Sequence, residues 1–292
     1  MNLYVATHHL LLHTTSNQIQ FAPLASSYYN KPLVRTKQVW HINYQLITKS
    51  ESPSLEKPDF KGSSYDEQLI PFNWSLSHQG DALILLVEFQ NDTLLYRTRA
   101  ELNFKNKTIR IDLLPKNPQA ILAIDPLFHP LGSLLMVYLA HSSNGFLIHA
   151  SGVQSNKKGH LFSAVSGTGK STMASLWKKT GAVVVNDDRL WIEKTDDQWW
   201  MYNTPMIWYA QEPQKAPVHN VFLLSQSPIN KLTPIRGLNA GMQILSNCIQ
   251  HLYNKDMTQQ HLDKLIAFSK DVEIFRCAFK PDQEIVEIIK KL

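Results

Sequence analysis

The segment from residue 160 to residue 181 constrains the fold of this 292-residue chain more than any other part of its sequence. A short apolar run ends in a loop with two glycines, and the residues after the loop have the apolar i, i+3, i+4 spacing of a helix with one buried face. Gly181 stands where a glycine commonly ends a helix. This strand–loop–helix order is typical of an α/β core. Its parts are the strand 160–163, the loop Ala164–Gly169 and the helix 171–180.

The loop has the composition of a phosphate-binding loop. Two glycines let the backbone turn its N–H groups inward, and the N-terminus of the following helix adds partial positive charge. Lys170 would reach the β- and γ-phosphates, and the Ser171 hydroxyl would bind Mg²⁺. Ala164 replaces the glycine with which the usual pattern begins. We therefore expect ATP with Mg²⁺ as the ligand, bound by Ser166, Gly167, Thr168, Gly169, Lys170, Ser171 and Thr172.

Acidic residues follow the next strand-like run, residues 182–185, at Asp187 and Asp188. Phosphoryl transfer from a magnesium-bound nucleotide uses one carboxylate near the metal and another that accepts the proton of the acceptor hydroxyl. His149 closes an earlier apolar strand. If the two strands are neighbours, its side chain faces Asp187 and can orient that carboxylate or change its pKa. The alternatives are a plain turn at 187–188 and a histidine that makes only a structural hydrogen bond.

Three short stretches resemble the catalytic domain of HPr kinase/phosphorylase. In that family a histidine, a Ser-Gly-X-Gly-Lys-Ser loop and an Asp-Asp-Arg strand end occur in the same order at like spacing. The loop also resembles that of the ATP-dependent phosphoenolpyruvate carboxykinases, which belong to the same structural group. Those enzymes are much longer than this chain, and their substrate-binding arginines have no evident counterpart here. The three stretches are His149-Ala150-Ser151-Gly152-Val153, Val165-Ser166-Gly167-Thr168-Gly169-Lys170-Ser171 and Asn186-Asp187-Asp188-Arg189.

The resemblance implies a role for each matching residue. Asp187 resembles the base that takes the proton from a serine hydroxyl, and His149 resembles its hydrogen-bonded partner. Lys170 resembles the phosphate clamp. Ser171 and Asp188 resemble the residues that hold magnesium. The resemblance therefore implies Asp187, His149 and Lys170 as catalytic residues and Ser171 and Asp188 as metal ligands.

The chain also departs from the HPr kinases. Thr172 stands where they have a glutamate directly after the loop serine, and no Gly-Arg-Asn run like the one associated with their dephosphorylating activity follows downstream. The N-terminal region is β-rich and does not resemble their α/β regulatory domain. The chain is therefore more similar to the HPr-kinase-like proteins, some of which accompany peptide-modification systems and phosphorylate a serine on a precursor peptide.

Two domains are expected. Residues 1–115 predict a β-rich region, a meander of antiparallel strands with hairpin turns at Asn91-Asp92 and Asn106-Lys107 and no catalytic residues. Prolines then break the pattern, and residues 116–292 predict a P-loop kinase-like catalytic domain. The fold class expected is α/β (α+β overall), with an HPr-kinase/PEP-carboxykinase-like core. Its further helices are expected at 127–140, 240–253, 258–269 and 282–291, with a strand at 275–279.

The composition excludes several other classes of protein. Hydrophobic residues make up 43% of the chain and charged residues 18%, as in ordinary soluble proteins. No apolar run reaches the about 20 residues of a membrane-spanning helix, and no secretory signal is recognisable. Cys248 and Cys277 fit buried thiols in a reducing cytosol, so we expect a cytoplasmic protein. The net charge of +5 is scattered, which disfavours nucleic acid and leaves a protein or peptide partner, with homo-oligomerisation open.

Some charged residues outside the motifs are weaker candidates. Glu193 or Glu212 could support the metal. Arg236 and Arg276 could stabilise the moving phosphoryl group, although surface ion pairs explain them as well. Arg189 follows the acidic pair, where a structural ion pair is an equal alternative.

Two aromatic or histidine-rich stretches are ambiguous. The segment 202–209 could shape an acceptor pocket or stack on adenine, and packing in the core explains it equally well. His9 and His13 are four residues apart, a spacing that suits a metal only on a helix. Because they lie in an expected strand, they do not predict a metal site.

We therefore expect an ATP-dependent kinase that transfers the γ-phosphoryl group to a hydroxyl, in particular to a serine of a protein or peptide. One alternative is a sensor or scaffold that binds a nucleotide without phosphoryl transfer. The other is an enzyme that phosphorylates a small molecule such as free serine or a carboxylic acid.

Overall fold

The computed structural model describes all residues except 30–31, 50–57, 64–70, 93, 206–210 and 252–253. The chain divides into two compact units, the first made of residues Met1–Leu135 and Pro205–Glu212, the second of Met136–Thr204 and Pro213–Leu292. A compact unit need not be an independently folding domain, so the domain boundary expected between residues 115 and 116 stays a prediction. None of the described helices is long and apolar enough to span a bilayer.

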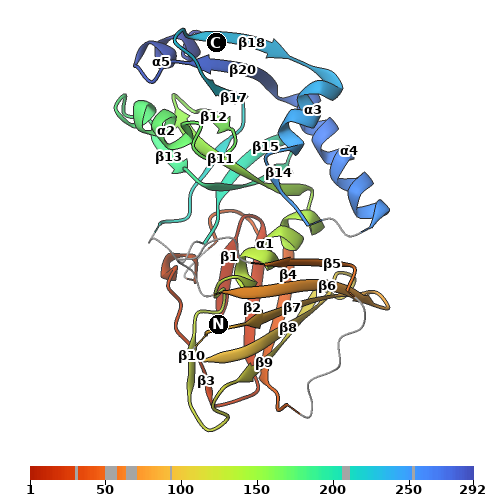
Figure 1. The fold of residues 1–292 in the computed structure, drawn as a ribbon. Helices are drawn as coiled ribbons and strands as arrows, with labels where there is room; N and C mark the ends of the chain where they lie inside the picture. Colours follow the sequence, from red (N-terminus) through yellow and green to blue (C-terminus); the bar gives the residue numbers. More distant parts are fainter. Residues whose placement is uncertain (30–31, 50–57, 64–70, 93, 206–210, 252–253) are drawn as a thin grey trace. The chain divides into compact units, whose positions relative to one another are not determined.

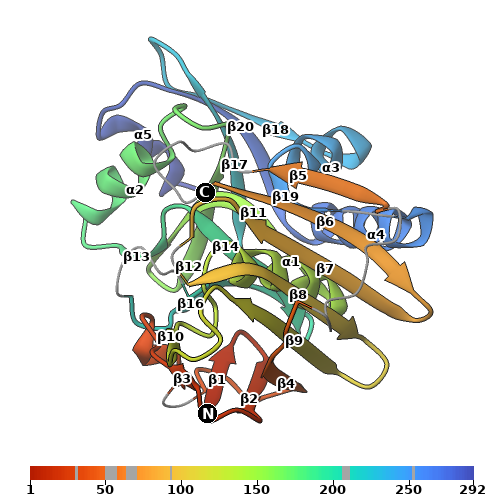
Figure 2. The same ribbon diagram turned by 60° about the horizontal axis from the view of Figure 1, so that its bottom comes forward.

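The first unit is built on a mixed eight-stranded sheet in the order β1-β2-β4-β9-β8-β7-β6-β5, whose strands lie side by side in Figure 2. A parallel pair, β3 and β10, lies outside it. The bounds of its elements are β1 (Asn2–Val5), β2 (His8–Thr14), β3 (Ile19–Phe21), the 3-10 helix η1 (Ser26–Tyr29), β4 (Gln38–Leu46), β5 (Phe60–Ser63), β6 (Phe72–Gln79), β7 (Ala82–Phe89), β8 (Leu95–Asn103), β9 (Thr108–Pro115), β10 (Leu122–Ile124) and α1 (Leu131–Ser142), which continues into the second unit.

The two hairpins expected from the sequence are present, because β7 pairs with β8 and β8 with β9 in antiparallel directions. The expectation of a purely antiparallel meander is wrong. β4 pairs in parallel with both β2 and β9. Periodicity shows which face of a strand is buried, as at Trp40, Ile42 and Tyr44, each 0% exposed, but it does not show the direction of the neighbouring strand. That direction depends on long connections, which carry no turn signal.

The second unit contains a ten-stranded sheet whose main path is β16-β15-β14-β11-β12-β17-β20-β18. The strands β12, β17 and β20 are parallel, and β13 and β19 both pair with β11. The bounds are β11 (Gly145–Ser155), β12 (Lys158–Ser163), α2 (Lys170–Lys178), β13 (Val183–Asn186), β14 (Arg189–Thr195), β15 (Gln198–Asn203), β16 (Lys215–Pro217), β17 (Asn220–Gln226), β18 (Lys231–Ile235), α3 (Gly237–Leu245), β19 (Cys248–Ile249), α4 (Lys255–Asp271), β20 (Glu273–Phe279) and α5 (Glu284–Ile289).

Helices cover both faces of this second sheet, with α2 and α5 on one side and α3 and α4 on the other (Figure 1). Each face of the sheet therefore has its own hydrophobic core. Successive residues of β12 point to opposite faces: Leu161 packs with the residues of α3 and α4, and Phe162 packs with those of α2 and α5. In α2 the stripe Met173, Leu176 and Trp177 is buried, as the helical spacing predicts. The structure is thus of the mixed α/β class.

The helix expected over residues 240–253 is present only in its first part. The expected helix 240–253 ends at Leu245, and Cys248 and Ile249 form the strand β19. There they pair with Ile148 and Leu147 of β11. The hydrogen bonds offered by the edge of β11 replace those that a longer helix would make, which local periodicity does not reveal.

Candidate active site

The glycine loop lies between β12 and α2, in the strand–loop–helix arrangement expected from the sequence. Gly167 and Gly169 both have positive φ, +79° and +113°, values that side-chain-bearing residues rarely adopt. The loop is also tied to the neighbouring strand β17, because Gln226 Nε2 donates a hydrogen bond of 3.4 Å to the carbonyl oxygen of Gly167. The backbone therefore makes the turn for which the sequence requires glycine.

The N-terminus of α2 faces the loop. Gly169 is the N-cap residue, and it makes no side-chain capping hydrogen bond. A β-carbon at Gly169 would lie 2.8 Å from Cζ of Phe279, the last residue of β20. Backbone N–H groups at an uncapped helix N-terminus together with the helix dipole favour an anion, and phosphate is the usual one.

Lys170 holds the loop together. Its side chain is largely buried, and Nζ donates to the carbonyl oxygens of Ala164, at 3.0 Å, and Val165, at 3.2 Å. Burial lowers the pKa of this ammonium, and the carboxylate of Asp188 acts in the opposite direction. The lysine charge therefore stabilises the loop and interacts electrostatically with Asp188 of the acidic turn.

The hydroxyl groups expected to bind the nucleotide lie on the accessible side of the loop. Ser166, Ser171 and Thr172 are exposed, and Thr168 is half-buried. Ser171 and Thr172 belong to the first turn of α2. Mg²⁺ is usually bound by one or two protein oxygens together with substrate phosphates, so an accessible hydroxyl at this turn fits the ion.

The acidic pair forms a tight turn between β13 and β14. Asp187 is exposed and Asp188 half-buried. Hydrogen bonds from β11 hold their backbone: Ala150 N donates to the carbonyl oxygen of Asp188 at 3.1 Å, and Ser151 Oγ to that of Asp187 at 3.3 Å. The sequence expectation that this turn lies beside the His149 strand therefore agrees with the geometry.

His149 contacts a different carboxylate from the one expected. Its Nδ1 lies 3.3 Å from Oδ1 of Asp188, whereas the sequence paired it with Asp187. The strand register explains the difference. His149 lies opposite Arg189 in the β11–β14 pair, so Asp188, the residue before Arg189, lies next to the imidazole ring. Burial, reinforced by the charge of Lys170, lowers the pKa of His149, while Asp188 raises it. Burial therefore favours the neutral imidazole.

Other charged candidates lie in different surroundings. Glu193 is buried and accepts a hydrogen bond of 3.2 Å from the indole Nε1 of Trp191. Arg276 donates to Gln243 Oε1 at 3.3 Å. Glu212 belongs to the first compact unit. The contacts described for Glu193 and Arg276 involve neither the loop nor the acidic turn.

The structure also describes part of the aromatic stretch 202–209 and the histidine pair His9 and His13. Tyr202 is buried, and residues 206–209 lie outside the described residues. His9 is 3.0 Å from Asn2 Oδ1, and His13 stacks on His41. No group of three or more histidine, cysteine, aspartate or glutamate side chains in the described part of the chain forms a preformed metal site.

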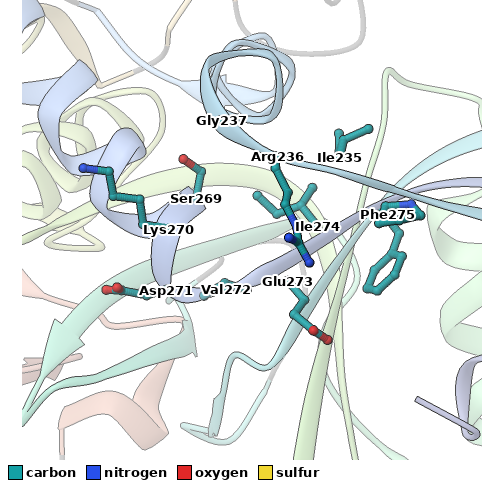
Figure 3. Close-up of a pocket in the computed structure, with 11 residues that line it drawn as sticks. Ile235, Arg236, Gly237, Ser269, Lys270, Asp271, Val272, Glu273, Ile274 and Phe275 are labelled. Atoms are coloured by element: carbon teal, nitrogen blue, oxygen red, sulfur yellow. The ribbon is translucent and has the colours of Figure 1, made fainter.

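A pocket of about 390 Å³ lies at the other end of β20 from the glycine loop (Figure 3). Arg236, named from the sequence as a charge stabiliser, lines it and extends toward Glu273. Phe275 is the lining residue nearest to the end of β20 at Phe279, so about 13 Å of strand separates this pocket from the residue that packs against Gly169. Its polar side chains are exposed or half-exposed, and its buried lining residues are apolar. Arg236 is thus not part of the glycine-loop site.

Sequence reasoning assigned no role to two residues that shape the site. Phe279 packs against the loop at Gly169, and its only sequence signal is an apolar position in an expected strand. Asn186 lies beneath the acidic turn and is 1% exposed. An asparagine directly before an expected turn is a recognised signal for a side chain that hydrogen-bonds the backbone two residues on.

Comparisons with known proteins add little to this geometry. No protein-family model and no curated protein matches the chain. Among solved structures, the chain is similar to the Hpr(Ser) kinase/phosphatase from Coxiella burnetii, at 12% identity and a TM-score of 0.28. The alignment covers 49% of this chain and 91% of the other. A TM-score of this size carries no argument, so the function has to be argued from the residues themselves.

Proposed function

We propose that this protein is an ATP-dependent kinase that transfers the γ-phosphoryl group to a hydroxyl, namely the serine of a protein or peptide. The observation that supports it most is the position of Asp188. This carboxylate lies 3.3 Å from His149, and its charge opposes the burial that lowers the pKa of the Lys170 ammonium. Nucleotide binding alone does not require a histidine and two adjacent carboxylates, Asp187 and Asp188, whereas phosphoryl transfer uses one carboxylate near the metal and another as the base.

The residues of the loop fit a magnesium-bound nucleoside triphosphate. The positive φ at Gly167 and Gly169 and the uncapped start of α2 suit phosphate oxygens. Ser171 and Asp188 would hold Mg²⁺, which when bound neutralises charge on the phosphates. Lys170 would move from the loop carbonyl oxygens to the β- and γ-phosphates.

Asp187 is the proposed base. It is the exposed member of the pair, and its backbone is held one residue before Asp188, so an acceptor hydroxyl can approach it from solvent. The acceptor oxygen forms a bond to the γ-phosphorus while the bond from that phosphorus to the β,γ-bridging oxygen breaks, and ADP leaves. The hydroxyl proton passes to the carboxylate of Asp187. His149 acts on the neighbouring Asp188, which it orients.

The test uses matched variants and labelled ATP. Asp187→Asn should lower the transfer rate by about a hundredfold or more, because general-base catalysis contributes about 10²–10⁴. Its ATP affinity should be unchanged. Lys170→Ala should weaken both binding and transfer. Asp197→Asn makes the same chemical change in the exposed β14–β15 turn and should behave as the wild type. Transfer at the wild-type rate by Asp187→Asn would refute the assigned base.

The same experiment separates the other functions. Labelled ATP is incubated with the protein and cell extract, and proteins are then separated from metabolites. Label in a protein or peptide supports the proposal. Label in a small molecule identifies a small-molecule kinase, and ATP binding without any labelled product identifies a sensor or scaffold.

A further inference from the structure

The side chain of Asn186 supports the acidic turn from beneath. It ends β13, is 1% exposed, and its Oδ1 accepts two backbone hydrogen bonds, from Asp188 N at 2.8 Å and from Arg189 N at 3.0 Å. We propose that Asn186 is a positioning residue, which fixes the Asp187-Asp188 turn so that Asp188 can hold the metal of the bound nucleotide. This inference rests on the proposed function and extends it to a residue with no contact to substrate.

The turn is held on both sides of its backbone. Asn186 accepts from two N–H groups, and β11 donates to two carbonyl oxygens through Ala150 N and Ser151 Oγ. With the backbone on either side of Asp188 fixed, its carboxylate can change position only by side-chain rotation. The contact of 3.3 Å with His149 restricts that rotation as well. A metal ligand held in this way before substrate arrives loses less entropy when the metal binds.

An asparagine meets this requirement better than other side chains of its size. Leucine has the same branched arrangement of four side-chain heavy atoms but no acceptor, so two N–H groups would lose their partner, each at a cost of about 1–3 kcal/mol when buried. Aspartate accepts both bonds but would add a buried negative charge beside two carboxylates. Serine reaches a backbone N–H two residues on, more weakly than asparagine does.

The consequence concerns only the magnesium-dependent part of nucleotide affinity. The glycines, the start of α2 and Lys170 bind phosphate without the metal, and they do not depend on Asn186. Loss of the Asn186 acceptor should therefore leave the metal-free affinity for the nucleotide unchanged and reduce the increase in affinity that Mg²⁺ causes. Because two hydrogen bonds of ordinary strength are lost, the increase in nucleotide affinity caused by Mg²⁺ should fall by about tenfold or more.

The experiment measures the dissociation constant of a non-hydrolysable ATP analogue by calorimetry, once with Mg²⁺ and once with EDTA. The variants are Asn186→Leu, Asn186→Ser, Asp188→Asn and the double variant Asn186→Leu/Asp188→Asn. The control is Asn203→Leu, because Asn203 is also buried, at 2% exposed, and its Oδ1 accepts a 2.8 Å bond from the backbone N of Gln214. This control removes a buried side-chain acceptor from a backbone N–H that does not belong to the turn.

In EDTA, we expect equal affinities for the wild type, Asn186→Leu, Asn186→Ser and Asn203→Leu. With Mg²⁺, the gain should be full in the wild type and Asn203→Leu, reduced in Asn186→Ser and smallest in Asn186→Leu. The double variant should bind no more weakly than Asp188→Asn, because Asn186 acts through Asp188. Should Asn186→Leu fail to fold, Asn186→Ser decides the question. A full Mg²⁺ gain in Asn186→Leu or in Asn186→Ser, losses that add in the double variant, or no Mg²⁺ gain in the wild type would each overturn the inference.

This measurement does not depend on catalysis. If the wild type shows the Mg²⁺ gain and the expected pattern but transfers no phosphate, the kinase proposal fails and the role of Asn186 remains. Amide hydrogen exchange gives a second measurement on the same variants. The N–H groups of Asp188 and Arg189 should exchange faster in Asn186→Leu than in the wild type, and unchanged protection would contradict the proposed support.

Discussion

Replacing Gly169 by alanine tests whether the glycine loop has the shape described. The residue has φ of +113°, and an added β-carbon would lie 2.8 Å from Cζ of Phe279. Phe279 is 2% exposed and belongs to the core formed with α2 and α5, so its ring has little room to move. The substitution therefore strains the backbone and overpacks the core at one position.

The expected cost is the sum of these two effects. A side-chain-bearing residue at positive φ costs about 1–2 kcal/mol. Overpacking of a dense core costs about 1–3 kcal/mol. Together they amount to about 2–5 kcal/mol, a large share of the about 5–15 kcal/mol that stabilises a typical domain. Gly167→Ala is the matched control, because its φ is +79° but no atom lies within 4 Å of the added carbon, so only the backbone effect applies.

The assay is urea unfolding followed by circular dichroism, combined with titration of an ATP analogue. Gly169→Ala should unfold at clearly lower urea and bind ATP more weakly than Gly167→Ala. Phe279→Leu in the Gly169→Ala background should recover part of the loss, since the smaller side chain removes the contact. The reasoning would be refuted if the two alanine variants were equally stable, or if Gly169→Ala matched the wild type in both stability and ATP affinity.

Two further predictions concern stability. Burial lowers the pKa of His160 to about 4, so the unfolded chain takes up a proton in preference to the folded one as the pH falls from about 6.5 to about 4. The free energy of unfolding should therefore decrease over this range, by up to about 1.4 kcal/mol per pH unit for this imidazole, and urea titrations should show a shallower dependence in His160→Gln. In the first unit, Arg99 is 7% exposed and contacts both Glu101 Oε2, at 2.9 Å, and Asp112 Oδ2, at 3.4 Å. Arg99→Met should destabilise this unit by about 3 kcal/mol, since it removes one partner of a buried pair, and Asp112→Asn in the same background should restore part of that; thermal unfolding with no loss in Arg99→Met would show that the pair contributes nothing.

Local sequence patterns were sufficient to predict several elements of the second unit. The glycine loop, the buried stripe of α2 and the acidic strand end all depend on neighbours in sequence, and each is present at the expected residues. Their physical basis is local: glycine is needed for positive φ, apolar side chains repeat at the period of a helix, and both requirements can be read from adjacent letters. The hairpins of the first unit follow from turn residues for the same reason.

The tertiary structure decided what depends on pairing between distant segments. The register of β11 with β14 placed His149 beside Asp188 and not Asp187. Pairing with the edge of β11 explains why the end of an expected helix forms the strand β19. Long connections explain why β4 is parallel to both of its neighbours. Strand partners and register are set by contacts between residues far apart in the chain. The sequence therefore determined which groups are available for phosphate chemistry, and only the folded sheet decided which carboxylate the histidine contacts.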